Sequence, residues 1–255
     1  EAGPAIAAVL TDPRNASDQW IPTAAISAAA KNDKSFLEAA AAAKGTPEGL
    51  RLLVNAVKVV AGHYARGVPG DSVAAVLTTL KAADPLVCEA ALSGLVNGWP
   101  ADKAPNNKEQ LETALADLIE KLPPSGQALV IALAQRWNAG GKLQEKTAAT
   151  RKALLDQAAD EDMSDAQRIL ALRQAVAMNP SDAEVASVLN LMTPRANTAF
   201  SSGVLEELSA GSSTIFAAEV FKRWPALTPA ARRTSIASLL KRDAWTQALL
   251  GAIEA

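Results

Sequence analysis

Cysteine and histidine are almost absent from this sequence. Its 255 residues contain one of each, Cys88 and His63. One cysteine cannot form an internal disulfide, and a structural zinc site takes four Cys or His ligands. These absences exclude a disulfide framework and a Cys/His metal centre, and we expect neither a metal nor a cofactor. They leave the cellular compartment open.

An excess of one charge and long apolar runs are also missing. Lys and Arg number 25 and Asp and Glu 27, so the formal net charge is −2. Nucleic-acid binding requires a basic stripe that displaces counterions from phosphates. We therefore expect no nucleic-acid partner. No apolar run approaches the ~20 residues of a membrane span, and no signal peptide is recognisable at the N-terminus.

What the sequence does contain is a helical pattern. Apolar residues make up 49% and aromatic residues 4%, so the interior is built mainly from Ala, Leu, Val and Ile. These residues recur at three- and four-residue spacing, which is typical of amphipathic helices, and Ala is the best helix former. Thr46 precedes Pro47 and Thr228 precedes Pro229, which predicts two capped helix starts. We predict an all-α fold.

The predicted helices form pairs. After a leftover helix near 4–10, the pairs are 20–31 with 33–43, 47–65 with 71–82, 85–98 with 108–121, 124–138 with 143–159, 164–178 with 182–192, 194–210 with 213–224, and 228–242 with 243–255. Their first helices begin 27 to 40 residues apart. That step is close to the ~40 residues of HEAT-type units, and the signature of the ~34-residue TPR unit is missing.

Helix pairs in such a series bury their apolar faces by stacking on their neighbours, which gives a curved surface. We therefore predict a right-handed α-solenoid of about seven HEAT/armadillo-like pairs. It forms a single HEAT-like repeat domain over residues 1–255, with a truncated repeat at 1–19. The chain is expected to be a fragment of a larger one. The polar segment 101–108 is predicted to be a surface loop, and Gly140-Gly141 a helix-ending turn rather than a phosphate-binding loop.

Few side chains suggest chemistry of their own. His63 lies near a helix end, where the dipole favours a histidine, and the sequence indicates no nucleophile or orienting carboxylate beside it. Cys88 lacks the basic neighbours that would activate a thiol, so we expect it to be buried. The acidic run 160–162 with Asp165 lacks the turn glycine of a calcium loop and is interpreted as a solvated loop. We predict no catalytic, cofactor-binding or metal-binding residue.

One local excess of positive charge is the candidate interaction surface. It consists of Lys222, Arg223, Arg232, Arg233, Lys241 and Arg242. Adjacent residues diverge by about 100° around a helix, and cations at helix ends complement the dipole, so structural roles are one reading. A docking surface for an anionic partner or a neighbouring domain is the other.

Five tryptophans are expected at helix starts or ends. They are Trp20, Trp99, Trp137, Trp224 and Trp245. Their bulk in an Ala-rich fold favours a role as plugs between repeats, with a ligand-stacking role as the alternative.

Two segments resemble a known protein region. Residues 12–37, with Asp18-Gln19-Trp20-Ile21-Pro22 at their centre, are similar to a HEAT-like segment of bacterial multidomain proteins known as membrane-bound dehydrogenases. Residues 221–254 resemble the way that region closes, through Arg223-Trp224-Pro225 and Leu239-Leu240-Lys241-Arg242 to Trp245. In that family a PQQ-type sugar dehydrogenase propeller precedes the repeats and a c-type cytochrome follows them.

The resemblance implies a spacer that holds an oxidising domain and an electron acceptor in a fixed geometry, and export to the periplasm. One cysteine and one histidine cannot form the family's Cys-x-x-Cys-His haem-attachment motif, so no redox residue carries over to this chain.

Three hypotheses for function remain. The leading one is a non-catalytic scaffold or protein-interaction module that binds protein domains in cis or in trans. The second is a HEAT-like nucleic-acid-binding enzyme such as a DNA glycosylase, which the neutral charge disfavours. The third is a chromophore- or peptide-binding module, which would need the tryptophans to line a concave face.

Overall fold

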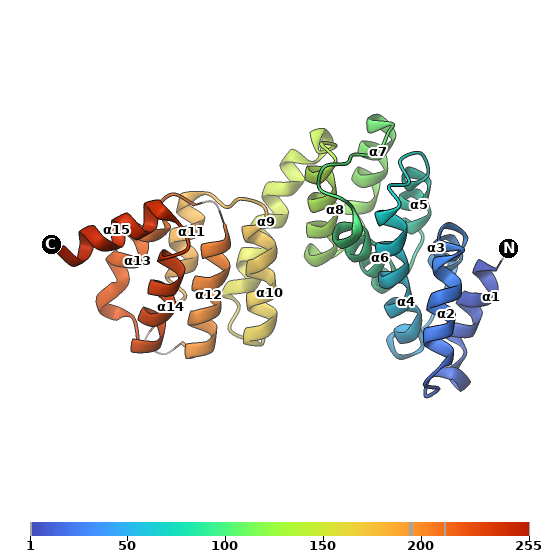
Figure 1. The fold of residues 1–255 in the computed structure, drawn as a ribbon, viewed down its shortest axis with the longest axis horizontal. Helices are drawn as coiled ribbons and strands as arrows, with labels where there is room; N and C mark the ends of the chain where they lie inside the picture. Colours follow the sequence, from blue (N-terminus) through green and yellow to red (C-terminus); the bar gives the residue numbers. More distant parts are fainter. Residues whose placement is uncertain (1, 194–195, 212, 255) are drawn as a thin grey trace. The chain divides into compact units, whose positions relative to one another are not determined.

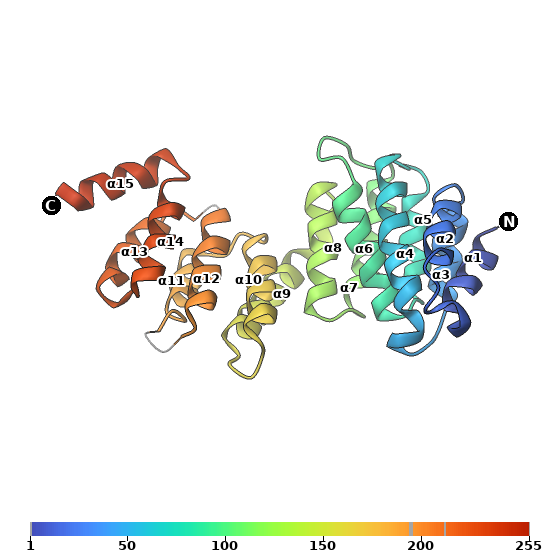
Figure 2. The ribbon, with the colours of Figure 1, turned by 60° about the horizontal axis from the view of Figure 1, so that its bottom comes forward.

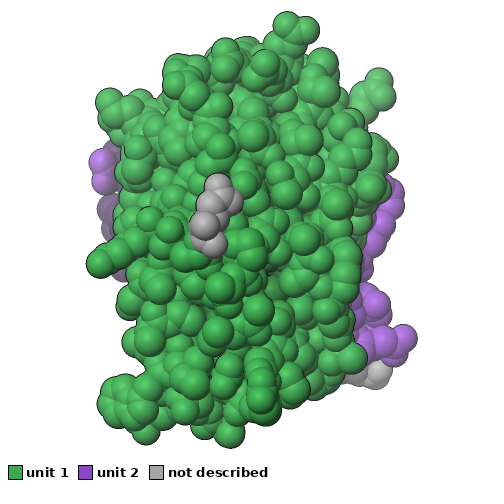
Figure 3. Space-filling model, turned by 90° about the vertical axis from the view of Figure 1, so that its right-hand side faces the viewer, with its two compact units in different colours: residues 1–145 green, residues 146–255 purple. Residues whose placement is uncertain are grey.

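The computed structural model describes residues 2–193, 196–211 and 213–254, and over these residues the chain contains helices and no strands (Figure 1). The all-α prediction is confirmed. The chain divides into two compact units, 1–145 and 146–255, shown in green and purple in Figure 3. The boundary falls at the start of α9, so the fourth predicted pair has its two helices in different units. The single repeat domain stays a prediction.

Unit 1 contains eight α-helices among its described residues. They are α1 (Gly3–Thr11), α2 (Ile21–Ala30), α3 (Asp33–Ala42), α4 (Pro47–Arg66), α5 (Val73–Leu80), α6 (Pro85–Gly98), α7 (Lys108–Ile119) and α8 (Pro124–Arg136). Two short 3₁₀ helices, η1 (Pro13–Asn15) and η2 (Gly141–Leu143), lie in its loops.

The remaining seven α-helices follow from the boundary onward. They are α9 (Gln144–Ala159), α10 (Asp165–Val176), α11 (Asp182–Leu189), α12 (Thr198–Ala210), α13 (Phe216–Arg223), α14 (Pro229–Leu239) and α15 (Asp243–Glu254), with η3 (Trp224–Ala226) between α13 and α14. The predicted helix at 194–210 begins at Thr198, and residues 194–195 lie outside the described part of the chain.

Helix starts follow the capping chemistry of the sequence. Thr46 and Thr228 accept backbone N–H bonds from Gly49 and Ala231, and each precedes a proline at the first helical position. Ser164 and Ser181 form full capping boxes with the residue three positions on. Each such cap stabilises its helix by ~1 kcal/mol, which explains why these starts could be predicted.

The helix-ending turn predicted at Gly140-Gly141 lies at Trp137-Asn138 instead, and Gly141 begins η2. Asn138 takes the left-handed conformation with φ 51°, and the N–H of Ala139 donates to the carbonyl of Ala134 at 2.8 Å. Neither glycine has a positive φ. Asparagine is the commonest substitute for glycine at this position, because its side chain tolerates the left-handed region.

Helices within each unit pack on their second neighbours in the chain. In unit 1, α2, α4, α6 and α8 contact one another in order and form one row, which stands side by side in Figure 2. The helices α1, α3, α5 and α7 form a second row in the same way. In unit 2, α10, α12 and α14 form one row, and α11, α13 and α15 the other.

The unit 2 core lies between these rows. Phe200, Val204, Leu205, Phe216 and Val220 are fully or almost fully buried there. Each buried side chain of this size stabilises the fold by ~1.5–3 kcal/mol relative to leaving it in water.

Two helices of unit 1, α4 and α6, approach each other very closely. A Cβ on Gly94 would lie 2.7 Å from the Cβ of Ala61 and closer still to the carbonyl oxygen of Lys58. Glycine is required here because the two backbones approach too closely for any side chain. This contact is the most extensive one between helices among the described elements.

Polar links between the pairs share a characteristic spacing. Side-chain hydrogen bonds to distant parts of the chain join residues separated by 27 to 40 positions. Asn106 reaches Asp71 across 35 residues, Asn197 reaches Asp165 across 32, and Thr234 reaches Ser202 across 32. The spacing matches the step of the predicted pairs, and the last three bonds connect corresponding positions of neighbouring pairs.

Candidate interaction site

Three arginines bind the C-terminal end of a helix in the preceding pair. The last four carbonyl groups of a helix have no partner within it and carry the negative end of its dipole. Arg136 donates to the carbonyls of Val96 and Trp99 at the end of α6. Arg223 and Arg242 make the same kind of contact in unit 2. We call these contacts carbonyl clamps.

Arg223, at the end of α13, is the most fully bonded of the three. Its Nη2 donates to the carbonyl of Ala186 in α11 at 3.0 Å and to Oδ1 of Asn190 at 2.6 Å. Its Nη1 donates to the carboxylate of Glu219, one turn earlier. The hydrogen bond from Arg223 is the main cause of the lowered pKa of Glu219.

Arg242 and Lys241 form a similar link in the other row of unit 2. Arg242 donates to the carbonyls of Ser209 and Gly211 at the end of α12, and its guanidinium lies 4.3 Å from the ring centre of Trp245. Lys241 donates to the hydroxyl of Ser209 at 2.9 Å. Both cations therefore hold α12 to the turn between α14 and α15.

Arg232, Lys222 and Arg233 complete the predicted set. Arg232 donates to the carbonyls of Trp224 and Pro225 and lies over the Trp224 ring at 5.8 Å. Lys222 is 73% exposed and forms a long ion pair with Glu219 at 3.9 Å. Arg233 is exposed. Four of the six cations thus bind elements of the fold, and whether the set also forms an interaction surface stays a prediction.

The cations leave a strong local excess of positive charge. Between residues 213 and 242 the sequence contains these six cations and one acidic residue, Glu219. A guanidinium bonded to neutral carbonyls keeps its full charge, so only the Glu219 carboxylate offsets the positive field in this segment.

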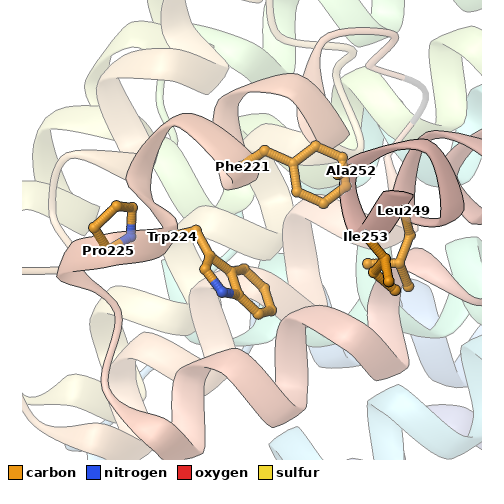
Figure 4. A pocket seen from close by; sticks show the side chains of 6 residues that line it. All are labelled: Phe221, Trp224, Pro225, Leu249, Ala252 and Ile253. Atoms are coloured by element: carbon orange, nitrogen blue, oxygen red, sulfur yellow. The ribbon is translucent and has the colours of Figure 1, made fainter. Parts of the chain in front are cut away.

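Beside these cations lies an apolar groove that the sequence reasoning missed. Phe221, Trp224 and Pro225 line one side of it and Leu249, Ala252 and Ile253 the other (Figure 4). The cavity has a volume of about 360 Å³. The apolar pattern of residues 245–253 could have indicated this groove. It places more leucine and isoleucine on α15 than the contact with α13 buries. Leu250 and Ile253 are exposed.

The tryptophans divide into two kinds. Trp99 and Trp137 are buried at the ends of α6 and α8, with ring centres 4.8 Å apart in an edge-to-face contact. Trp245 is buried against Phe216 at 4.9 Å. These three fit the predicted plug between helix pairs. Trp20 does not fit it, because it is 73% exposed at the start of α2, where Asp18 accepts its backbone N–H.

The two residues considered for chemistry have structural surroundings. Cys88 is buried, and burial raises the pKa of its thiol to about 12, as expected for a small core residue. His63 is half exposed near the end of α4, with its Nδ1 3.6 Å from the carboxylate of Asp33 in α3. The expectation that no carboxylate lies near His63 was wrong, because the two residues come from different helices, 30 positions apart in the sequence.

The acidic run 160–162 is a loop that caps itself. Oδ1 of Asp160 accepts the N–H of Asp162, and Asp165 bonds Arg168 and Asn197. Within the described ranges no cluster of three or more Asp, Glu, His or Cys side chains is arranged to hold a metal ion.

Among the described residues, none of the helices combines the length and hydropathy that a membrane crossing requires.

Comparison of the chain with protein-family models, with curated proteins and with solved structures finds no match in any of the three.

Proposed function

We propose that this chain is a non-catalytic scaffold, a right-handed α-solenoid of about seven HEAT-like helix pairs that binds protein domains. The observation that carries the proposal is the packing of alternate helices, linked by hydrogen bonds at separations of 27 to 40 residues. Repeat proteins are built in this way, because each pair buries its apolar face only against its neighbours. Extended surfaces made by such stacks serve as binding platforms.

The carbonyl clamps support the same reading. Arg136 and Arg223 each bind the end of a helix 33 to 40 residues earlier, in different units of the chain. In an array of helix pairs, the same type of hydrogen bond is expected to recur at the repeat spacing. The position of α1 agrees with this as well, since it packs on α3 as the second helix of an incomplete pair would.

The chemically capable side chains support a role without catalysis. A nucleophilic cysteine needs a lowered pKa and access to solvent, whereas Cys88 is buried and its pKa is raised. His63 faces one carboxylate on the surface, and neither group lines a described cavity. A general base works in a site that excludes water and positions a substrate.

The resemblance of residues 12–37 and 221–254 to the HEAT-like region of membrane-bound dehydrogenases supports a more specific proposal. In it the chain is the spacer between a dehydrogenase propeller and a cytochrome c domain, in an exported, periplasmic protein. The chain would set the distance and orientation of the two redox domains, and its partners would be those domains.

A three-part fusion tests the spacer role. The chain is placed between a PQQ-type sugar dehydrogenase propeller and a c-type cytochrome, and the reduction of the haem is followed after sugar is added. We expect one intramolecular rate that does not depend on protein concentration. A Gly/Ser linker of equal length is the control, and it should give a spread of slower rates because its ends sample many distances. Equal kinetics for the two fusions would refute the spacer.

The absence of catalysis is tested on the purified chain alone. Absorbance spectra and elemental analysis should show no stoichiometric haem or metal, and sugar oxidation with an artificial electron acceptor should stay at the level of buffer. A bound redox group with turnover would overturn the proposal.

A further inference from the structure

The apolar groove between α13, η3 and α15 combines three properties. Its walls are apolar, its volume is about 360 Å³, and one of its walls carries an aromatic ring with a cation beside it. Ile253 is 72% exposed at its edge. Isolated exposed apolar residues are ordinary, but a concave apolar lining with exposed leucine and isoleucine beside it is typical of a binding site.

The groove has the form that accepts a helix. Leu249, Ala252 and Ile253 are spaced three and four residues apart on one face of α15, so a second helix can lay its apolar seam along them. The opposite wall comes from the end of α13 and from η3, where Trp224 provides a wide flat surface. Tryptophan and arginine together are the residues most enriched among energetically important interface positions.

The charge around the groove defines which kind of partner helix it can bind. Arg232 binds the backbone of Trp224 and Pro225, both of which line the groove, and it keeps its charge because its partners there are neutral carbonyls. Lys222 follows Phe221 and is exposed, and the Glu219 carboxylate is bonded to Arg223. Glu254, next to Ile253, is the acidic residue at the opposite edge. Across residues 213–254 the sequence has six cations and three carboxylates, so the local charge is positive although the whole chain is at −2.

From this combination we infer that the groove binds an amphipathic helix of a partner protein, with an apolar seam for the groove and carboxylates that face Arg232 and Lys222. This inference rests on the proposed function and specifies the partner that one part of the scaffold takes. Helix-in-groove recognition supplies affinity through the buried seam, and the flanking charges select the partner and speed its association.

Two alternatives to an acidic helix of a partner protein are a basic helix and a second copy of this chain. A basic amphipathic helix would place its cations against Arg232 and Lys222, and like charges that face each other across an interface weaken binding. A second copy of the chain would have to offer α15, whose two carboxylates suit the charge of the groove. Its apolar residues Leu249, Ala252 and Ile253 already line the groove of their own chain, so the same face of α15 would have to serve two grooves.

A fluorescent peptide tests the inference with the full chain. The probe is a synthetic helix with a leucine seam and glutamates on both flanks, and its anisotropy is followed as the chain is added. Two control peptides keep the seam and carry lysines, or keep the glutamates and lose the seam. We expect that only the peptide with both the leucine seam and the glutamates binds saturably, and that its binding weakens as the salt concentration rises. Stronger binding of the lysine peptide would overturn the assignment of charge, and no binding of any peptide would overturn the site.

Two variants with a matched control locate the binding. Ile253→Glu puts a charge at the edge of the groove, and Leu170→Glu makes the same kind of change at a leucine of α10 that is 51% exposed. Ile253→Glu should weaken binding at least tenfold and Leu170→Glu should leave it unchanged. Lys222→Glu should weaken the glutamate peptide by several fold and improve the lysine peptide. Equal effects of Ile253→Glu and Leu170→Glu would place the peptide elsewhere and refute the groove.

Sedimentation of the chain without peptide tests the second copy. We expect a monomer at the concentrations of the titration. A dimer that Ile253→Glu abolishes would show that α15 of another copy fills the groove, and would overturn the inference. The two proposals fail separately: the fusion experiment can succeed while every peptide fails, and the peptide can bind while the fusion kinetics match those of a flexible linker.

Discussion

Alanine at position 94 should destabilise the contact between α4 and α6. The new Cβ would lie 2.7 Å from the Cβ of Ala61, where carbon atoms normally stay 3.5–4.0 Å apart. Because the other two close atoms, the carbonyl oxygen of Lys58 and the amide nitrogen of Gly62, belong to the helix backbone, no side-chain rotation relieves the clash. The two helices must separate by about 1 Å, which forfeits a quarter to a half of the dispersion energy of the contacts that move.

The expected magnitude combines two opposing effects. Overpacking of a close contact costs ~1–3 kcal/mol, and the upper end applies where backbone meets backbone. Replacing glycine by alanine within a helix returns about 1 kcal/mol. We therefore expect Gly94→Ala to lower the free energy of unfolding by ~2 kcal/mol.

Gly62→Ala is the matched control. It lies on the facing helix in the same contact, but its Cβ would be 3.5 Å from the nearest atom, the carbonyl oxygen of Gly94, which is an ordinary separation. This variant should be neutral or slightly more stable than the parent. Urea unfolding, followed by tryptophan fluorescence and circular dichroism, measures both variants. Equal stability of the two alanine variants would refute the close approach of these helices.

Three further predictions concern single side chains. Burial raises the pKa of Glu89 despite its hydrogen bond from Ser125. The charged carboxylate therefore destabilises the fold as the pH rises above the ordinary glutamate pKa of ~4.3. Glu89→Gln should raise the urea midpoint at neutral pH and leave it unchanged below pH ~4. Cys88 is buried and its pKa is raised to about 12, so it has about a thousandfold less thiolate than an ordinary cysteine. A thiol reagent should therefore label it only after the chain unfolds. Labelling of the folded chain at the rate of a free thiol would contradict its burial. Arg223→Ala should lower the free energy of unfolding by ~2 kcal/mol in urea, because it removes the hydrogen-bond donor to the end of α11 and leaves Glu219 only its long ion pair with Lys222. Arg223→Lys should restore only part of this loss. An Arg223→Ala variant as stable as the parent would show that this clamp does not stabilise the fold.

Local chemistry made the helices predictable. Helix starts are predicted by the pairs Thr46-Pro47 and Thr228-Pro229. The three- and four-residue apolar spacing predicts which face of a helix is buried. Such signals depend on neighbours within one turn. The 3₁₀ helices η1, η2 and η3 were not predicted, since three-residue elements leave no periodicity to detect.

The candidate site was less predictable, because it depends on contacts between distant residues. The sequence shows that Arg223 and Arg242 lie near helix ends, which favours a role with a helix dipole. It does not show that the dipoles belong to helices of the preceding pair, 31 to 37 residues earlier. The pairing of His63 with Asp33 and the exposure of Trp20 were missed for the same reason.

Removal of one complete helix pair tests the central claim, that the chain is a stack of equivalent pairs. Deleting residues 198–228 removes α12, α13 and η3 and joins the cap Asn197 directly to Pro229, the first residue of α14. The rows keep their alternation, so the account predicts a folded protein with parental helix content per residue and cooperative unfolding by circular dichroism. Deleting 198–210, which removes α12 alone, breaks the alternation and should abolish the cooperative unfolding of unit 2. If the pair deletion unfolds as completely as the single-helix deletion, the pairs are not equivalent units and the account is contradicted.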